Sequence, residues 1–409
     1  MASKIFMGTM PEIMENILNN LNNEFHSLHS CALVSRHCGA TLHTLDLHFS
    51  EFLEFSPEIF YSLGENKQFF SQLQNLSLGV ISHFNIESVA TLLRVLAKNT
   101  TSIKSLKLDG FNSDYEPQLL HTLFYALICI IKSQEQLRKF SLVGGEEFPT
   151  EFYGIISALE SQKNSLQEVI VEYCDYSTEF EILDNCKKLE ILRVRYCETK
   201  LLKILNYKIN TLELVDTSFD ASTISAIAQI IEKSGILLQR LIFESIDEII
   251  CEKSLLLNAL KSHCPNITYL NITNIRISTQ LLDLIGNLQN LQFLTLVFVL
   301  DIPEEELEIR VMQFAEILPL TLQYLDVGDP WFNSYVDIFF KYCNAPLKKV
   351  LIDHLDNEKN TKALIEFCKR NKTLKYVGVN RYFELDKNIR KEVKKYVTLV
   401  TYERIIVNF

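Results

Sequence analysis

One short pattern of apolar residues recurs along most of this sequence. Leu, Ile, Val or Phe occupies the first, fourth and sixth positions of a six-residue segment. Twelve such segments follow one another at a mean spacing of about 27 residues. They begin at Leu73, Ile103, Leu137, Leu166, Leu189, Ile209, Leu238, Ile267, Leu291, Leu322, Leu347 and Leu374. The alternation at the end of each segment predicts a short strand with one buried face.

The stretches between these segments follow a helical spacing. Ile86, Val89, Ala90, Leu93 and Leu96 lie three or four residues apart, and residues 281–288 repeat the pattern. A further segment at Leu42 lies upstream by about one period. Each unit therefore reads as strand, turn, helix and turn. Because one unit cannot bury its own apolar face, we expect the units to stack around a shared core, with parallel strands on a concave side and helices on a convex side.

Two turns of this array carry a more specific pattern. Cys186, Leu189, Leu192, Val194 and Cys197 form the spacing CxxLxxLxLxxC, and Cys264-Pro-Asn-Ile267 opens a similar turn. This pattern resembles the cysteine-containing subclass of leucine-rich repeats, in which a small buried thiol packs at the turn. The resemblance implies an α/β leucine-rich-repeat solenoid over residues 39–409. We expect a C-terminal capping segment that includes a basic helix from Lys387 to Tyr396.

Residues 1–38 do not fit the repeat. A first helix is predicted to begin at Met10-Pro11-Glu12, because proline suits the first turn of a helix. Its apolar stripe is Ile13, Ile17, Leu18 and Leu21. A second helix carries Leu33 and Val34 and ends in Ser35-Arg36-His37. We therefore expect a short α-helical module at residues 1–38, ahead of the repeats.

This order of residues resembles the F-box, with its Met-Pro-Glu opening, Ile-Leu-x-x-Leu helix end and Ala-Leu-Val-Ser-Arg segment. The resemblance implies a module that docks on a Skp-type adaptor of a cullin ligase. The matching positions are Pro11, Ile13, Ile17, Leu18, Leu33 and Val34. Cys38 stands where the F-box usually carries a tryptophan, and the chain then runs directly into Leu42, so the F-box looks truncated and lacks its third helix. The alternative is that the two helices only cap the solenoid, since exposed repeat ends require a cover.

Composition narrows the functional classes. The net charge of −11 argues against a nucleic-acid-binding protein. The longest apolar run, Leu123 to Ile131, has nine residues, whereas a membrane span needs about 20. We expect that run on the buried side of a repeat helix. No secretory signal opens the chain, so we expect reduced cysteines and a cytoplasmic or nuclear location.

The sequence lacks the residue patterns that a zinc site or a common type of enzyme active site would need. The early His and Cys residues do not have the spacing of a zinc site; they are His26, His29, Cys31, His37, Cys38, His43 and His48. No GxGxxG, P-loop, HExxH or GxSxG motif occurs. We therefore expect a protein that is not an enzyme and needs no metal or cofactor.

The strand residues that alternate with the core predict a recognition surface. In the C-terminal half these are Tyr269, Phe293, Tyr324 and Tyr376, with Trp331 nearby. Exposed aromatic side chains on a rigid backing are typical hot spots of protein interfaces. Acidic residues beyond the strands would favour a basic segment of the partner; these are Asp109, Glu172, Glu244, Asp329 and Asp353. The alternative is that the aromatic rings pack on one another or under the C-terminal segment.

The sequence thus predicts the substrate receptor of a cullin-based, SCF-type ubiquitin ligase. The F-box-like module would dock on a Skp-type adaptor, and the repeats would bind the target protein. The alternative is a leucine-rich-repeat interaction scaffold with no ligase association. Adaptor binding by the segment from Pro11 to Val34 separates the two hypotheses.

Overall fold

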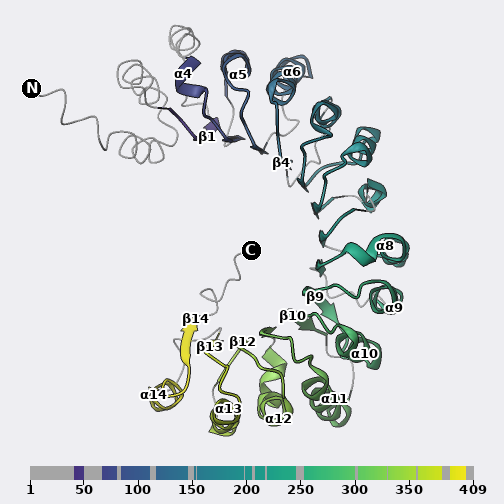
Figure 1. The fold of residues 1–409 in the computed structure, drawn as a ribbon, viewed down its shortest axis with the longest axis vertical. Helices are drawn as coiled ribbons and strands as arrows, with labels where there is room; N and C mark the ends of the chain where they lie inside the picture. The colour runs from purple at the N-terminus through teal and green to yellow at the C-terminus, as the bar shows by residue number, and fades with distance from the viewer. Residues whose placement is uncertain are drawn as a thin grey trace, which may run out of the picture. The chain divides into compact units, whose positions relative to one another are not determined.

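The computed structural model describes residues 41–49, 67–80, 84–110, 117–145, 152, 154–197, 199–204, 208–216, 219–245, 253–299, 303–328, 330–355, 358–379 and 387–401. The chain divides into two compact units, Met1–Lys208 and Ile209–Phe409. In each unit the strands lie side by side on one side and the helices cover the other (Figure 1). The F-box-like module at residues 1–38 lies outside the described residues.

The first unit alternates parallel strands with short helices. The strands are β1 (Thr44–Phe49), β2 (Asn75–Val80), β3 (Ser105–Asp109), β4 (Lys139–Val143), β5 (Glu168–Glu172) and β6 (Ile191–Arg195). The α-helices are α4 (Lys67–Phe70), α5 (Ile86–Asn99), α6 (Pro117–Ser133) and α7 (Ile155–Ala158). The 3₁₀-helices are η2 (Leu159–Gln162), η3 (Thr178–Asn185) and η4 (Thr199–Ile204). The helical segments shorten along this unit, from α5 and α6 to the 3₁₀ turns.

The second unit repeats the same order, with an α-helix between each strand and the next. Its strands are β7 (Thr211–Asp216), β8 (Arg240–Ser245), β9 (Tyr269–Ile275), β10 (Phe293–Phe298), β11 (Tyr324–Val327), β12 (Lys349–Ile352), β13 (Tyr376–Val379) and β14 (Thr398–Thr401). Its α-helices are α8 (Ala221–Ser234), α9 (Ser254–His263), α10 (Thr279–Asn287), α11 (Glu304–Ile317), α12 (Val336–Tyr342), α13 (Glu358–Arg370) and α14 (Lys387–Val393). Two 3₁₀ turns, η5 (Gly235–Leu237) and η6 (Pro330–Tyr335), complete it.

Every predicted apolar segment forms a strand, which confirms the repeat pattern. Each of β1 to β13 begins two residues after the first apolar residue of its segment. Neighbouring strands within a unit pair in parallel and in the same register, so that Asn75 lies opposite Ser105, and Ser105 opposite Lys139. Strand β14 was not predicted. The expected C-terminal helix is present as α14, but it ends at Val393 rather than at Tyr396.

The core of each unit lies between the strands and the helices. The apolar residues of the repeat pattern are buried there, as in β2, where Leu73, Leu76 and Leu78 have almost no exposed surface. The apolar run from Leu123 to Ile131 lies in α6 with its inward face buried, as predicted. Helix α5 begins at an Asn85 side chain that accepts a hydrogen bond from the Ser88 amide at 3.0 Å, which satisfies an amide with no partner inside the helix.

Two buried glutamines join neighbouring repeats where a helix ends. The Gln134 side chain accepts from the Ile103 amide at 2.9 Å and donates to the Thr100 carbonyl at 3.0 Å. One repeat later, the Gln162 side chain accepts from the Leu137 amide and donates to the Gln134 carbonyl. Buried backbone groups must be paired, and no strand or helix offers a partner at these places. The side-chain amides of the two glutamines supply those partners.

A second recurrent turn follows the fifth residue of the strands. At this position Gly110, Tyr173, Tyr196 and Asn274 all have positive φ, between 50° and 69°. The turn directs the chain away from the sheet toward the next helix. At Gly110 a side chain would also meet the Val80 carbonyl oxygen at 2.9 Å, so glycine is required there both by backbone conformation and by space.

We predict that Gly110→Ala destabilises the protein by about 1–2 kcal/mol, because alanine resists the left-handed conformation. Gly286→Ala is the matched control, since its Cβ would have its nearest contact at 3.9 Å, inside helix α10. The control should be neutral or stabilising. Urea denaturation followed by circular dichroism measures both changes. Equal stability of the two variants would contradict the role assigned to this turn.

Candidate protein-binding surfaces

The alternation of strand residues exposes one side of the sheet in each unit. The first, third and fifth residues of each strand point away from the core, because side chains in a strand alternate between its two faces. In β2 these residues are Asn75, Ser77 and Gly79. We call this side of the sheet the strand face, and its chemistry differs between the two units.

In the first unit the strand face is hollowed into a groove of about 700 Å³. Its lining residues are Thr44, Leu45, Asp46, Asn75, Leu76, Ser77, Ser105, Lys107, Asp109, Lys139, Ser141, Val143, Gly144, Ile170, Glu172, Tyr173 and Arg195. Small residues at several outward positions of β2 to β4 leave room for the hollow; these are Ser77, Gly79, Ser105 and Ser141. Hydroxyl, amide and charged groups line much of it, which gives many hydrogen-bonding positions.

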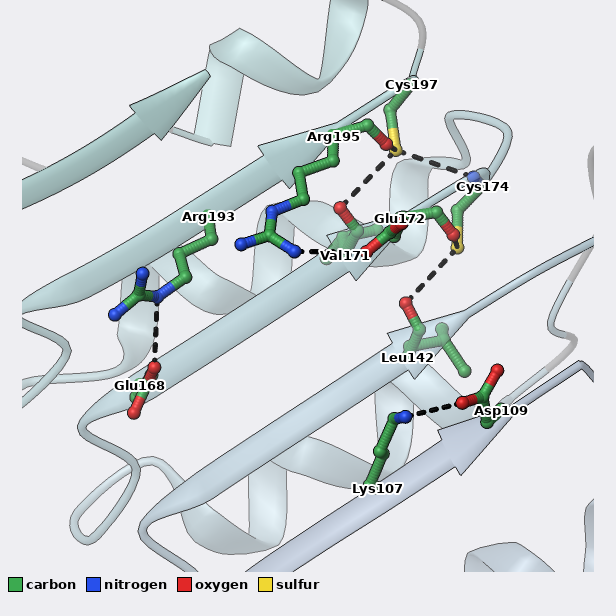
Figure 2. Close-up of polar contacts among 10 residues, drawn as sticks. All are labelled: Lys107, Asp109, Leu142, Glu168, Val171, Glu172, Cys174, Arg193, Arg195 and Cys197. Atoms are coloured by element: carbon green, nitrogen blue, oxygen red, sulfur yellow. Dashed lines mark hydrogen bonds and ion pairs between the residues drawn. The ribbon is translucent and has the colours of Figure 1, made fainter. Parts of the chain in front are cut away.

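Charged residues on β3 to β6 form ion pairs along this groove (Figure 2). The Lys107 ammonium lies 2.5 Å from the Asp109 carboxylate, and Arg195 lies 3.4 Å from Glu172. Glu168 accepts from two cations, Lys139 at 3.2 Å and Arg193 at 3.1 Å. Partly exposed pairs of this kind contribute little stability. Their consequence is that the groove presents both signs of charge to a partner.

The end of the groove near Tyr173 is held by two buried thiols (Figure 2). The Cys174 thiol donates to the Leu142 carbonyl at 3.8 Å, and the Cys197 thiol donates to the Val171 carbonyl at 3.6 Å. The Cys174 amide in turn donates to the Cys197 sulfur at 3.4 Å. These contacts fit the packing role expected of the cysteines in the repeat pattern.

Burial keeps the thiols of Cys174 and Cys186 protonated. It raises the pKa of Cys174 well above its ordinary value and raises the pKa of Cys186 to about 11. Because the thiolate is the reactive form of cysteine, both residues serve as packing groups, and the Cys174 thiol is also a hydrogen-bond donor. In front of Cys174 and Cys197, the rings of Tyr173 and Tyr196 stack with centroids 4.6 Å apart, which closes this end of the groove with an aromatic wall.

The aromatic residues predicted as a binding surface lie in the second unit. Tyr269, Phe293 and Tyr324 form a continuous row, with ring centroids 6.2 Å and 6.1 Å apart. The Arg240 guanidinium lies 4.8 Å from the Tyr269 ring centroid, and burial raises the pKa of the Tyr269 hydroxyl. Lys349 of β12 separates Tyr376 from this row. The Lys349 ammonium lies 5.8 Å from the centroid of the Tyr376 ring.

The expectation that the whole row is exposed is wrong for Tyr324. This residue is only 6% exposed and forms a buried cluster with Leu351, against which Phe293 and Val400 pack. Tyr376 remains 40% exposed. The aromatic rings thus pack partly on one another, as the alternative hypothesis stated, because adjacent strands bring residues in the same register within contact distance.

Trp331 also belongs to a packed cluster. It lies in η6, and its ring contacts Phe298 and Phe332 with centroids 5.6 Å apart, and Tyr335 at 6.0 Å. Its indole nitrogen has no hydrogen-bond partner among the described residues. The tryptophan is half-buried, so its main contacts are with the core of the second unit.

The predicted acidic rim is partly neutralised. Asp109 and Glu172 are paired with cations, as described above. The Glu244 carboxylate accepts from the Asn271 side chain at 2.6 Å, and the buried Asp353 accepts from Asn333 at 3.3 Å and lies beside His354. Asp329 lies outside the described residues. The charges therefore give weaker support to a basic partner than the sequence alone suggested.

The predicted adaptor-binding residues lie outside the described part of the chain. They are Pro11, Ile13, Ile17, Leu18, Leu33 and Val34. Sequence reasoning did not identify the groove of the first unit. The available signal was the run of small polar residues at outward positions, such as Ser77, Ser105 and Ser141, which leave space that larger side chains fill in the second unit.

Two further findings concern the described residues as a group. None of their helices has the length and apolar character needed to cross a membrane. Among them, no three His, Cys, Asp or Glu side chains gather as the ligands of a metal ion would.

Comparison with solved structures supports the repeat fold. One similar chain belongs to the crystal structure of the Rad7 and Elc1 complex in yeast, with a TM-score of 0.55 and 14% identity over 98% of this chain and 94% of that one. Another is the leucine-rich repeat-containing protein LegL7 from Legionella pneumophila, with a TM-score of 0.40 and 13% identity over 74% and 99%; that score is too low to support an inference. No protein-family model and no curated protein sequence matches the chain. The fold is thus an α/β leucine-rich-repeat solenoid.

We predict that Tyr324→Ala destabilises the protein by about 3 kcal/mol, because it leaves a cavity in a packed cluster. Tyr376→Ala should cost less than about 1 kcal/mol, since that ring is partly exposed. Urea denaturation of the two variants measures the difference. Similar losses would show that the two tyrosines are packed alike and would contradict the distinction drawn here.

Proposed function

We propose that this chain is the substrate receptor of a cullin-based ubiquitin ligase. In this proposal the F-box-like segment from Pro11 to Val34 docks on a Skp-type adaptor, and the strand face of the repeats binds the protein to be ubiquitinated. The receptor contributes no chemistry of its own. It raises the effective concentration of a substrate lysine near the charged ubiquitin carrier of the ligase.

The observation that carries the substrate-binding part of the proposal is the groove of the first unit. Neighbouring strands lie about 4.8 Å apart, so β1 to β5 span about 20 Å, which is the length of about six extended residues. The hydroxyl and amide groups of Thr44, Asn75 and Ser105 can hydrogen-bond to the backbone of such a segment.

Three further points support the proposal. The order of residues from Met10 to Arg36 resembles the F-box. The similar chain from yeast was crystallised in a complex of two proteins, Rad7 and Elc1. Cysteines at the repeat turns, such as Cys174 and Cys197, also fit the repeat subclass that commonly follows F-boxes.

The second candidate function is a repeat scaffold without a ligase. It is favoured by Cys38, which stands where the F-box usually carries a tryptophan.

We predict that the full chain co-purifies with a Skp-type adaptor as a stable 1:1 complex. Leu18→Asp and Val34→Asp should each abolish the complex, because a carboxylate cannot be buried in an apolar interface without a partner. Co-expression followed by size-exclusion chromatography measures this. A folded chain that does not bind the adaptor would sink the ligase proposal and leave the scaffold.

We also predict that filling the groove prevents substrate capture without affecting adaptor binding. Ser77→Arg combined with Ser105→Arg places two long cations in the hollow. A proteome-wide turnover measurement first identifies the proteins whose lifetime increases when the gene for this chain is deleted. In cells that carry only the groove variant, the same proteins should show the same increase in lifetime. Thr91→Arg with Ser157→Arg, which adds the same charge on exposed helical positions, should leave turnover normal. Normal turnover with the groove variant would place the substrate elsewhere.

A further inference from the structure

The last repeats carry a charge opposite to that of the rest of the chain. Residues 341–395 contain 15 Lys and Arg against 7 Asp and Glu, a formal charge of +8 in a chain whose total is −11. Such a reversal within a single fold concentrates positive charge on a small part of the surface. Its meaning depends on where the cations lie and on whether acidic groups neutralise them.

Many of these cations lie along one edge of the second unit, where each helix ends and the next strand begins. We call this set the basic edge. It consists of Lys341, Lys348, Lys369, Lys372, Lys375, Lys394 and Lys395, all of them exposed. Helices α12, α13 and α14 follow one another along the outer side (Figure 1). The Lys369 ammonium lies 5.6 Å from the Tyr396 ring centroid, which joins the end of α13 to the turn after α14.

Within the described residues, none of these seven lysines forms an ion pair. The contacts of three of them are with neutral groups: Lys348 donates to the Gln323 side chain at 2.7 Å, and Lys341 and Lys369 lie over tyrosine rings. Other lysines of the same repeats do find carboxylates. Lys359 pairs with Asp337 at 3.0 Å and Lys362 with Glu358 at 2.7 Å. The basic edge is therefore distinct from the neighbouring helix surface.

The favourable interaction of cations with the C-terminal end of a helix explains only part of this set. Lys341 and Lys369 lie in the last turns of α12 and α13, where a positive charge stabilises the helix only slightly. Lys348, Lys372 and Lys375 lie in the turns before β12 and β13, beyond the reach of that effect. Their mutual repulsion has no compensation inside the described structure, which is typical of a surface that meets an anionic partner.

We infer that the basic edge binds an acidic segment of a partner protein. The exposed ring of Tyr396 lies beside Lys369 on the same edge and adds apolar contact area to the electrostatic attraction. A long nucleic acid fits less well, because the rest of the chain is acidic and would repel phosphates outside the edge. The inference does not depend on adaptor binding or on the groove, since it concerns a different surface.

The test measures binding of a fluorescein-labelled decaglutamate peptide to the full chain by fluorescence anisotropy, at about 50 mM salt where charge interactions are weakly screened. The variant combines Lys369→Glu, Lys372→Glu and Lys395→Glu. The matched control combines Lys98→Glu, Lys132→Glu and Lys188→Glu, which makes the same change in charge at exposed helix ends and turns of the first unit.

We expect the edge variant to bind at least about tenfold more weakly and the control to bind within about twofold of the unchanged protein. Absence of measurable binding by the unchanged protein would overturn the inference, and so would an equal loss in both triple variants. A short DNA duplex serves as competitor. Its potency is compared with that of unlabelled decaglutamate, with both concentrations expressed per negative charge. If the duplex displaces the labelled peptide at the lower concentration, the edge is a nucleic-acid site and the inference is wrong.

Discussion

The structure depends on apolar burial that no single repeat achieves alone. A strand and helix of about 27 residues have one apolar face each, and only the next repeat covers it. The buried Leu76 and Leu78 of β2 lie in register with Leu106 and Leu108 of β3, so each layer of the core completes its neighbour. The buried side chains of Gln134 and Gln162 join repeats in the same way through backbone hydrogen bonds. Stability is therefore shared between neighbours rather than concentrated in one core.

This constraint also determines where function is located. Because alternate strand residues must fill the core, the remaining ones are free to vary, and each unit uses them differently. Small residues such as Thr44 and Ser105 leave a groove in the first unit. Large rings such as Phe293 and Tyr324 fill the corresponding positions in the second. The same backbone thus carries an open polar surface in one unit and a packed aromatic row in the other.

The sequence predicted the strands closely, because the repeat pattern is set by which residues must be buried. Strand β14 was missed, since Thr398–Thr401 contains only two apolar residues and follows a basic helix. The binding surface was predicted less well. Alternation shows that Tyr324 points away from the core, but not that it forms a buried cluster with Leu351. Likewise, the spacing of Lys107 and Asp109 does not by itself show that they pair.

The most direct test of the central claim is hydrogen–deuterium exchange of the full chain with and without a Skp-type adaptor. The claim is that one segment docks on the ligase while the repeats stay available to a substrate. It predicts strong added protection at residues 10–38 and unchanged exchange across β1 to β6 and β7 to β14. Added protection over the groove strands instead, or no added protection anywhere, would contradict it.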